Sequence, residues 1–317
     1  MTVVAETPTL RSRRRPRSAR ILRASVPYLL ILPVVVVITA ILGYPLYKLV
    51  TLSFQQYGLA ELIQRKGVWI GFDNYASVLR DDVFWDTLIR TVVFTAANVG
   101  LTIGLGTLIA ILLVQVSGWV RVLLTAGLIL AWSMPVVVAV QIWFWMTNFQ
   151  NGILNYALTE LWVGDWNQHN WYETSFSKLA MVTALIVWGA IPFVTITVYA
   201  GLAQVPRELV EAAEIDGAGP FRVFRDVTFP ILKPIFLILT SLSIIWDFGV
   251  FTQPYLLIGA SQIDATNYLM GVYVFVEAFD KSDFGRGAAI SLLMLLIVAV
   301  LSVFYVRRMV KMGEVVK

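Results

Sequence analysis

Six long apolar blocks constrain this chain more than any other feature of its sequence. They extend over Val26–Val50, Leu88–Gln115, Val122–Met146, Leu179–Leu202, Ile231–Phe251 and Ala288–Val306. A block of about 20 apolar residues is long enough to cross a hydrocarbon core of about 30 Å as a helix. In lipid, only helices and closed barrels satisfy every backbone polar group, and the sequence lacks the short alternating segments that a barrel needs. We therefore expect an all-α polytopic membrane protein with six transmembrane helices.

The few charged residues are distributed unevenly along the chain. Only 14% of the residues are charged, against about 25% in soluble domains. Directly before an apolar block, a basic cluster holds the N-terminus in the cytoplasm, although such a tail can also contact anionic lipid or RNA. We expect a basic cytoplasmic tail over residues 1–25 and a six-helix transmembrane domain over residues 26–317. The arginines of this tail are Arg11, Arg13, Arg14, Arg15, Arg17, Arg20 and Arg23.

Lysine and arginine also predict the orientation of the spans. With the N-terminus inside, the inner loops and the two termini hold 16 of the 24 basic residues, as the positive-inside rule predicts. Both termini are then cytoplasmic, and the outer loops cover roughly residues 51–87, 147–178 and 252–287. Five tryptophans in these loops form an interfacial belt or contact a docking partner: Trp69, Trp85, Trp162, Trp166 and Trp171.

The inner loop between the fourth and fifth spans, residues 204–234, has a helical pattern of its own. Pro206 suits the first turn of a helix, and Glu208 and Glu211 favour the positive end of the helix dipole. Gly217 can end that helix in a left-handed conformation. We therefore expect a short acidic helix that stops at Gly217.

A second short helix is expected to follow in the same loop. It begins at Pro220, and its Phe221, Phe224 and Val227 recur every third residue and form one apolar stripe. Pro230 and Pro234 are expected to end this unit and to open the next span. Two to eight residues would suffice to connect two helices. A self-packed amphipathic loop is one interpretation; a protruding element whose stripe enters a groove in a cytoplasmic partner explains the pattern better.

These residues resemble a known family. Glu211-Ala212-Ala213, three residues, Gly217, nine residues and Val227-Thr228-Phe229-Pro230 resemble the EAA loop of ABC-importer permeases, with Val227 and Phe229 in place of the usual Ile and Leu. Ile215-Asp216-Gly217-Ala218 is similar to the carbohydrate branch. The segments Gly43-Tyr44-Pro45, Gly71-Phe72-Asp73-Asn74-Tyr75 and Phe284-Gly285-Arg286-Gly287-Ala288-Ala289 look like the maltose F-like partner, whereas Gly259-Ala260-Ser261 departs from the common Gly-Gly-Pro.

The resemblance implies the ABC type I importer permease fold and a set of partners. These are a second, G-like permease, two copies of an ATP-binding subunit, an extracytoplasmic solute-binding protein and a sugar-like substrate, with membrane lipid around the chain and no nucleic acid. It implies a location in the bacterial cytoplasmic (inner) membrane. The chain contains no Gly-Lys dipeptide and hence no phosphate loop. We therefore expect no catalytic residue and no cofactor in this chain, with ATP and Mg bound by the partner ATPase.

The same resemblance implies a coupling role for part of the 204–234 loop. Glu211 is expected to pair with a cation of the ATPase, while Phe221 and Phe224 fill its groove. The full set of expected coupling residues is Glu211, Ala212, Ala213, Asp216, Gly217, Ala218, Phe221, Phe224 and Pro230.

A solute path is expected in the fifth span. Asp247 lies 14 residues beyond Lys233, or roughly 21 Å along a helix, and an acidic group at such depth faces a cavity or a partner. With Trp246 and Phe251 it can bind sugar hydroxyls and stack on a ring. The alternative is a structural hydrogen bond to another helix or to the partner permease. Four further aromatic residues are expected to pack: Trp143, Trp145, Trp188 and Tyr199.

Other classes of protein fit the sequence less well. A membrane-embedded enzyme or a metal site needs clustered acids, histidines or cysteines, and the chain has no cysteine and a single histidine, His169. A pore or scaffold leaves the 204–234 loop unexplained. Within transport, another small polar solute, such as glycerol phosphate or a polyamine, is the alternative to a sugar.

Overall fold

The computed structural model describes the backbone of residues 17–161, 164–259 and 262–315, and within them the side chains of residues 28–308. The first sixteen residues of the expected basic tail therefore lie outside the described residues, as do Trp162, Ala260 and Ser261. The chain divides into two compact units, Met1–Thr51 and Leu52–Lys317. Each is described by itself.

The first unit is a long helix that carries the first expected span. It consists of α1 (Arg17–Ile38), the π-helical turn η1 (Thr39–Gly43) and α2 (Tyr44–Ser53), which runs on into the second unit. The apolar stretch Tyr28–Ser53 is long enough to cross a membrane.

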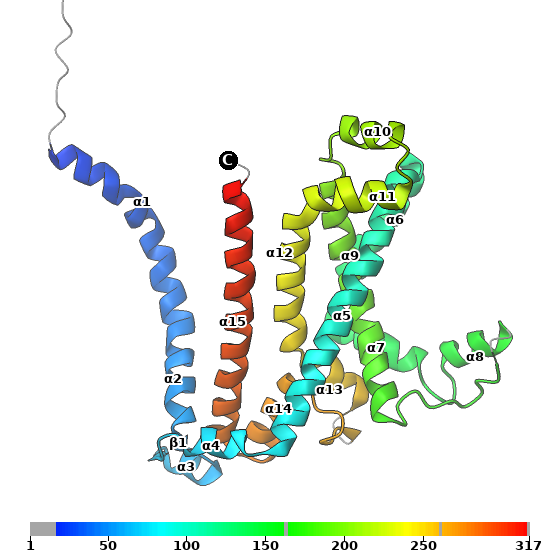
Figure 1. Cartoon of the computed structure of the whole chain (residues 1–317). Coiled ribbons are helices and arrows are strands. Elements are labelled where there is room, and N and C mark those ends of the chain that lie inside the picture. Colours follow the sequence, from blue (N-terminus) through cyan, green and yellow to red (C-terminus); the bar gives the residue numbers. More distant parts are fainter. Residues whose placement is uncertain (1–16, 162–163, 260–261, 316–317) are drawn as a thin grey trace, which may run out of the picture. The chain divides into compact units, whose positions relative to one another are not determined.

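The second unit holds the remaining elements and almost no sheet. A two-residue strand β1 (Gln55–Gln56) pairs antiparallel with β2 (Val68–Trp69). The helices are α3 (Leu59–Gln64), α4 (Asp73–Leu79), α5 (Asp82–Gln115), α6 (Gly118–Trp132), α7 (Val136–Met146), α8 (Ile153–Glu160), α9 (Ser175–Leu202), α10 (Arg207–Ile215), α11 (Pro220–Val223), η2 (Phe224–Thr228), α12 (Phe229–Phe248), α13 (Thr252–Ile258), α14 (Met270–Phe275), η4 (Val276–Asp280) and α15 (Phe284–Val315). Figure 1 shows α10 and α11 at the end of this unit where α15 finishes, with α4 and α14 toward the opposite end.

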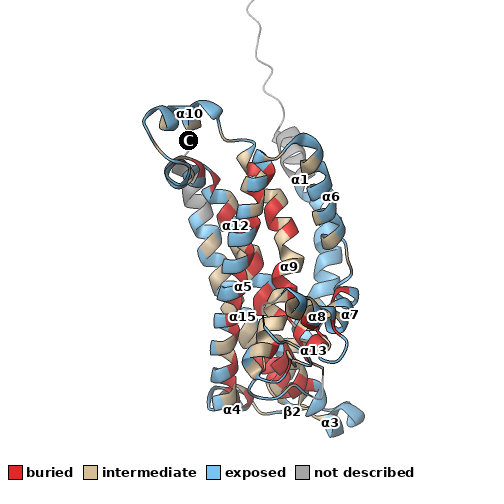
Figure 2. Cartoon of the chain, turned by 90° about the vertical axis from the view of Figure 1, so that its right-hand side faces the viewer, coloured by how far each residue is buried: buried red, intermediate tan, exposed pale blue. Residues whose placement is uncertain are grey.

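Helix α5 is the centre of the bundle and packs against α9, its most extensive contact, and against α12. The two long helices approach closely at Gly106, where a Cβ atom would lie 2.7 Å from Val194 Cγ1. The Thr195 hydroxyl donates a hydrogen bond of 3.2 Å to the Gly106 carbonyl across this contact. Figure 2 shows buried residues along the facing sides of α5 and α9 and an exposed surface over α10. Close packing between apolar helices therefore holds the bundle together, as expected for an all-α membrane protein.

A charged network fastens the opposite end of the bundle. Arg286 at the start of α15 forms an ion pair with Asp81. Its Nε also lies 3.2 Å from the Glu277 carboxylate. The Lys281 ammonium donates to that same carboxylate at 2.5 Å. The Tyr273 hydroxyl donates to Asp81 at 3.2 Å, and burial raises the pKa of Tyr273 to about 12. Glu277 is only 2% exposed. These ion pairs connect η4 and the start of α15 with Asp81, the N-cap residue of α5.

The spans agree with the sequence prediction at five places and differ at one. Among the described residues, five single helices are long and apolar enough to cross a membrane, and α6 and α7, which are bent by 100° at a short break, form a sixth span if they count together. The predicted span Val122–Met146 is therefore interrupted rather than one unbroken helix. The break falls at Ser133–Pro135, because Pro135 has no amide hydrogen and its ring clashes with the preceding turn.

The second helix of the 204–234 loop also differs from its prediction. Pro230 and Pro234 do not end it, because α11, η2 and α12 form a continuous helix over Pro220–Phe248, which Figure 1 shows bending between α11 and α12. The π-helical turn lets the amide of Phe229 bond to the carbonyl of Phe224, and Pro230 then lies in the first turn of α12, where a missing amide hydrogen is tolerated. The helix ends at Phe248 rather than at Phe251, with Gly249 as its C-cap.

Candidate functional site

The turn between α10 and α11 is a defined helix stop. Gly217 has a φ of +83°, which confirms the predicted left-handed conformation. Its amide donates to the Glu214 carbonyl at 3.0 Å, and the Ala218 amide donates to the Ala213 carbonyl at 2.9 Å. This pair of bonds is the Schellman motif. The backbone between the two helices is therefore held by local hydrogen bonds without help from the bundle.

Helix α10 presents acidic and apolar side chains outward. It has no buried residue; Val210 and Ala213 are half-buried, and Glu208, Glu211 and Ala212 are exposed. Within the described part of the chain, no hydrogen bond or ion pair engages the Glu211 carboxylate.

Two apolar residues extend from this end of the bundle, one on each side of the turn. Ile215 is 86% exposed and Phe221 is 75% exposed, and Asp216 beside Ile215 is also exposed. Large apolar side chains at such exposure on a turn make this surface a candidate for contact with another protein.

Phe221 and Phe224, which were predicted to lie in one apolar stripe, have different surroundings in the structure. Phe221 is exposed, whereas Phe224 is half-buried and packs against an apolar cluster that includes Val198 and Leu232. The centroids of the Phe224 and Phe229 rings are 6.4 Å apart. The continuous helix brings Phe224 onto its own bundle, so Phe221 alone of the two rings is available to a partner. Pro230 is exposed at the start of α12.

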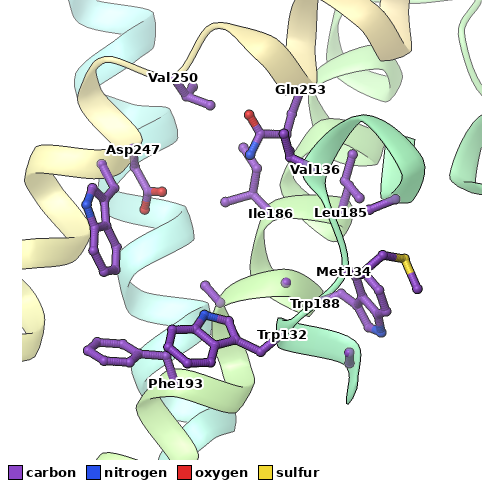
Figure 3. A pocket seen from close by; sticks show the side chains of 15 residues that line it. Trp132, Met134, Val136, Leu185, Ile186, Trp188, Phe193, Asp247, Val250 and Gln253 are labelled. Carbon is purple, nitrogen blue, oxygen red and sulfur yellow. The ribbon is translucent and has the colours of Figure 1, made fainter. Parts of the chain in front are cut away.

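A cavity of about 280 Å³ lies between α6, α7, α9, α12 and α13. Figure 3 shows side chains from these elements converging on it. Residues on both sides of the break between α6 and α7 line it, so the break that the sequence did not predict forms one of its walls. The residues that line it are Ala131, Trp132, Met134, Val136, Ala139, Leu185, Ile186, Trp188, Gly189, Ala190, Phe193, Trp246, Asp247, Val250 and Gln253.

Aromatic rings form a row along one side of the cavity. The rings of Trp132 and Phe193 are stacked with centroids 5.8 Å apart. Phe193 meets Trp246 edge to face at 5.6 Å. These rings come from α6, α9 and α12, and together they give this side of the cavity an aromatic, apolar wall.

Asp247 supplies the acidic group of the cavity. Its residue is 7% exposed, and Figure 3 shows its carboxylate directed toward the space that the Gln253 amide also faces. Among the described residues, no hydrogen bond or ion pair engages this carboxylate. The alternative of a structural hydrogen bond to another helix of this chain is therefore not what the structure contains.

Two of the three residues predicted for the solute path line the cavity, and one does not. Trp246 and Asp247 do, whereas Phe251 packs between Tyr255 and Phe275, each with its ring centroid 4.9 Å away. Trp188, predicted to pack, lines the cavity and also contacts Trp143 at 6.2 Å between centroids.

Sequence reasoning missed several residues of the cavity. Trp132, Phe193 and Gln253 come from three elements far apart in the sequence. Pro135, which breaks the third span beside Trp132, was the one available signal for this wall.

The described residues of the connection between α13 and α14 are bonded to two long helices, α9 and α5. The Lys178 ammonium donates to the Gln262 carbonyl at 3.1 Å, and the Arg90 guanidinium donates to the Tyr268 carbonyl at 2.9 Å. The Thr266 hydroxyl donates to Asp264 at 2.5 Å and holds the pKa of that carboxyl below its usual range. Within the described residues, no group of three or more potential ligands could hold a metal ion.

Comparisons with known proteins give a consistent result. Residues 102–310 match the family described as "Binding-protein-dependent transport system inner membrane component". The chain is 40% identical over 300 residues, 95% of this chain and 91% of the relative, to the diacetylchitobiose uptake system permease protein DasB of Streptomyces coelicolor. It is 30% identical over 285 residues, 90% of this chain and 93% of the relative, to the trehalose/maltose transport system permease protein MalF of Thermococcus litoralis.

The fold has a counterpart among solved structures. A chain from the crystal structure of a bacterial ABC transporter involved in the import of alginate superposes with a TM-score of 0.78, over 93% of this chain and 99% of that one, at 16% identity. At this identity the likeness shows the fold.

Proposed function

Because the chain belongs to the family of binding-protein-dependent transport system inner membrane components, we propose that it moves a sugar through its cavity by alternating access, driven by ATP hydrolysis in partner subunits. It is a permease subunit of a sugar ABC importer and not an enzyme. We propose in addition how the subunit is coupled to ATP hydrolysis, where the sugar passes and which partner subunits assemble with it.

One observation carries this proposal: a single helix joins the exposed loop to the cavity. Phe221 and Asp247 lie 26 residues apart in the continuous helix Pro220–Phe248, which is about 39 Å of helix at 1.5 Å per residue. A force applied at Phe221 is therefore transmitted along hydrogen-bonded backbone to the cavity wall. The π-helical turn η2 lies between the two and is the natural place for the helix to flex, because such turns interrupt regular α-helical bonding.

The exposed face of the 204–234 loop fits a cytoplasmic ATPase subunit. Glu211 offers an unpaired carboxylate, and Ile215 and Phe221 offer apolar contacts. An aromatic residue that enters a groove and a charge that finds its counterion are typical anchors of an interface. The expected coupling residues remain Glu211, Ala212, Ala213, Asp216, Gly217, Ala218, Phe221 and Pro230 at this surface, and Phe224 acts through the bundle.

The complete importer contains more chains than this one. We propose a second permease beside it, two ATP-binding subunits that bind ATP and Mg, and a solute-binding protein outside. The relative that takes up diacetylchitobiose supports a sugar as the solute. Another small polar solute is the alternative, and identification of the ligand of the binding protein decides between them.

The orientation follows from the same arrangement. The 204–234 loop and the end of α15 lie on one side of the second unit, and basic residues are enriched in both segments. The positive-inside rule supports a cytoplasmic position for both, together with the basic N-terminal tail. Because the chain has no cysteine, Ile215→Cys provides a single label site. A membrane-impermeant maleimide should react with it in inside-out vesicles and not in intact cells; the reverse pattern overturns the orientation.

The coupling is tested with two variants in the assembled importer. Glu211→Ala removes the charge, and Gly217→Asp places a new carboxylate on the exposed turn. Removing one partner of a desolvated pair costs about 2–5 kcal/mol, and an unpaired charge in a contact is unfavourable for the same reason, so both variants should lose sugar-stimulated ATP hydrolysis and uptake. Asp165→Asn, an exposed change in the loop before α9, is the control and should retain both activities. Full uptake in Glu211→Ala and Gly217→Asp would falsify the proposal.

A further inference from the structure

The charges around the cavity are unbalanced. Among the residues that line it, Asp247 is the only ionisable side chain, and neither lysine nor arginine accompanies it. Transfer of an unpaired carboxylate out of water is costly unless a donor compensates it. A solute group that donates hydrogen bonds is therefore favoured at this position.

The surroundings of Asp247 fit the same kind of solute. The Gln253 amide, which faces the same space, can both donate to and accept from a hydroxyl or an amide. The row formed by Trp132, Phe193 and Trp246 offers ring faces that stack on a sugar and that also attract a cation. None of these groups carries a positive charge that would offset a negative charge on the solute.

We propose that the cavity selects sugars without a negative charge. Rings that carry hydroxyl, amide or amine groups enter, and rings that carry a carboxylate, sulfonate or phosphate are rejected. The inference rests on the proposed function, since it names the class of sugar that the same cavity passes. Asp247 is the residue that sets this specificity: a hydroxyl or an ammonium donates to its carboxylate, whereas an anionic substituent is repelled by it at short range in a site of low dielectric.

The test uses the importer assembled with its partners in nanodiscs, without the solute-binding protein. Saturation-transfer NMR titrations measure the binding of three disaccharides with the same β-1,4-linked skeleton: cellobiose, its diamino counterpart chitobiosamine and its carboxylated counterpart cellobiouronate. Cellobiouronate should bind at least about tenfold more weakly than cellobiose, because like charges in a desolvated contact are strongly unfavourable. Chitobiosamine should bind at least as well as cellobiose.

Two variants separate the charge from the stacking surface. Asp247→Asn keeps the shape of the side chain and removes its charge, so cellobiose and cellobiouronate should then bind about equally. Trp246→Ala should weaken cellobiose and cellobiouronate alike, because stacking does not depend on the charge of the substituent, and chitobiosamine at least as much, because the attraction between the ring face and an ammonium group is lost as well. Asp165→Asn, an exposed change at a residue that does not line the cavity, should keep the original ranking, and the thermal midpoint of each complex checks its folding.

The results that would overturn this inference differ from the result that would overturn the proposed function. A uronate that binds as well as cellobiose, a ranking that Asp247→Asn leaves unchanged, or no binding of any of the three overturns the inference. ATP-driven sugar uptake, measured in the same complex with its binding protein, can persist in each of these cases. Failure of that uptake for every sugar overturns the proposed function instead.

Discussion

The 204–234 loop and the cavity are both functional candidates, but they are built in opposite ways. The loop is made of consecutive residues, its turn is held by two local hydrogen bonds around Gly217, and its first helix, α10, has no buried residue. The cavity draws its walls from five helices, and its acidic residue is nearly inaccessible. The difference teaches that consecutive residues can form a contact surface for another protein, whereas a solute site forms only when the whole bundle has folded.

The largest expected effect tests whether the loop is a docking surface. Phe221→Ala should weaken the binding of the ATPase subunits by about 2–4 kcal/mol, the range of interface hot spots. The stability of the bundle should not change, because Phe221 is 75% exposed. Affinity measured between purified permease and ATPase in nanodiscs checks the prediction. The control is Phe176→Ala, which removes a ring that is 84% exposed at the start of α9; equal losses in both variants would contradict a specific contact.

The next effect concerns the bundle that forms the cavity. Gly106→Ala should destabilise it by about 1–3 kcal/mol through overpacking, because the new Cβ would lie 2.7 Å from Val194 Cγ1. Gly104→Ala is the matched control, since nothing lies within 4 Å of a Cβ there. Thermal unfolding in detergent should separate the two variants. If they unfold alike, close packing of α5 on α9 is not what holds the bundle.

A smaller effect distinguishes the local character of the loop. Gly217→Ala places a side chain at a φ of +83°, and the left-handed conformation costs roughly 1–2 kcal/mol for such a residue. The affinity for the ATPase subunits should fall while the thermal midpoint of the bundle stays the same. Gly217→Asn should restore most of the affinity, because asparagine tolerates this conformation. Loss of bundle stability in Gly217→Ala would mean that the loop is not independent of the cavity region.

The smallest expected effect tests whether Trp246 contributes to the binding of a sugar in the cavity. Trp246→Ala should reduce the affinity for a bound sugar by about 0.5–1.5 kcal/mol, the contribution of an aromatic contact beyond its buried area. Trp145→Ala removes a ring that is 60% exposed and does not line the cavity, so its sugar affinity should equal that of the unchanged chain. Equal reductions in the two variants would argue that exposed tryptophans act through general packing.

The sequence predicted the loop well because its signals are local. Gly217 as a helix stop depends only on neighbours within one turn, and the spacing of Glu211 and Gly217 indicated the family. The division between Phe221 and Phe224 was not predictable in this way, because the direction of each ring depends on how α11 continues through η2 into α12.

The prolines show where sequence reasoning ends. Pro135 breaks a span, whereas Pro192 lies inside α9 and Pro234 inside α12 without a break. The local chemistry of the three residues is the same. The outcome depends on whether neighbouring helices and backbone groups replace the missing hydrogen bond, and the residues that do so are distant in the chain. The cavity wall at Trp132 was unpredictable for the same reason.

The π-helical turn η2 takes up one additional residue without changing the direction of the helix faces on either side of it. It holds one residue more than a regular α-helical turn would, and that residue is accommodated by widening a single turn, so the rotation between the two flanking segments stays close to that of an unbroken α-helix. Deleting a single residue from Phe224–Thr228 would therefore remove the widened turn while Phe221 and Asp247 kept their directions relative to each other. The flexibility of this helix can thus be removed without changing which way the docking ring faces.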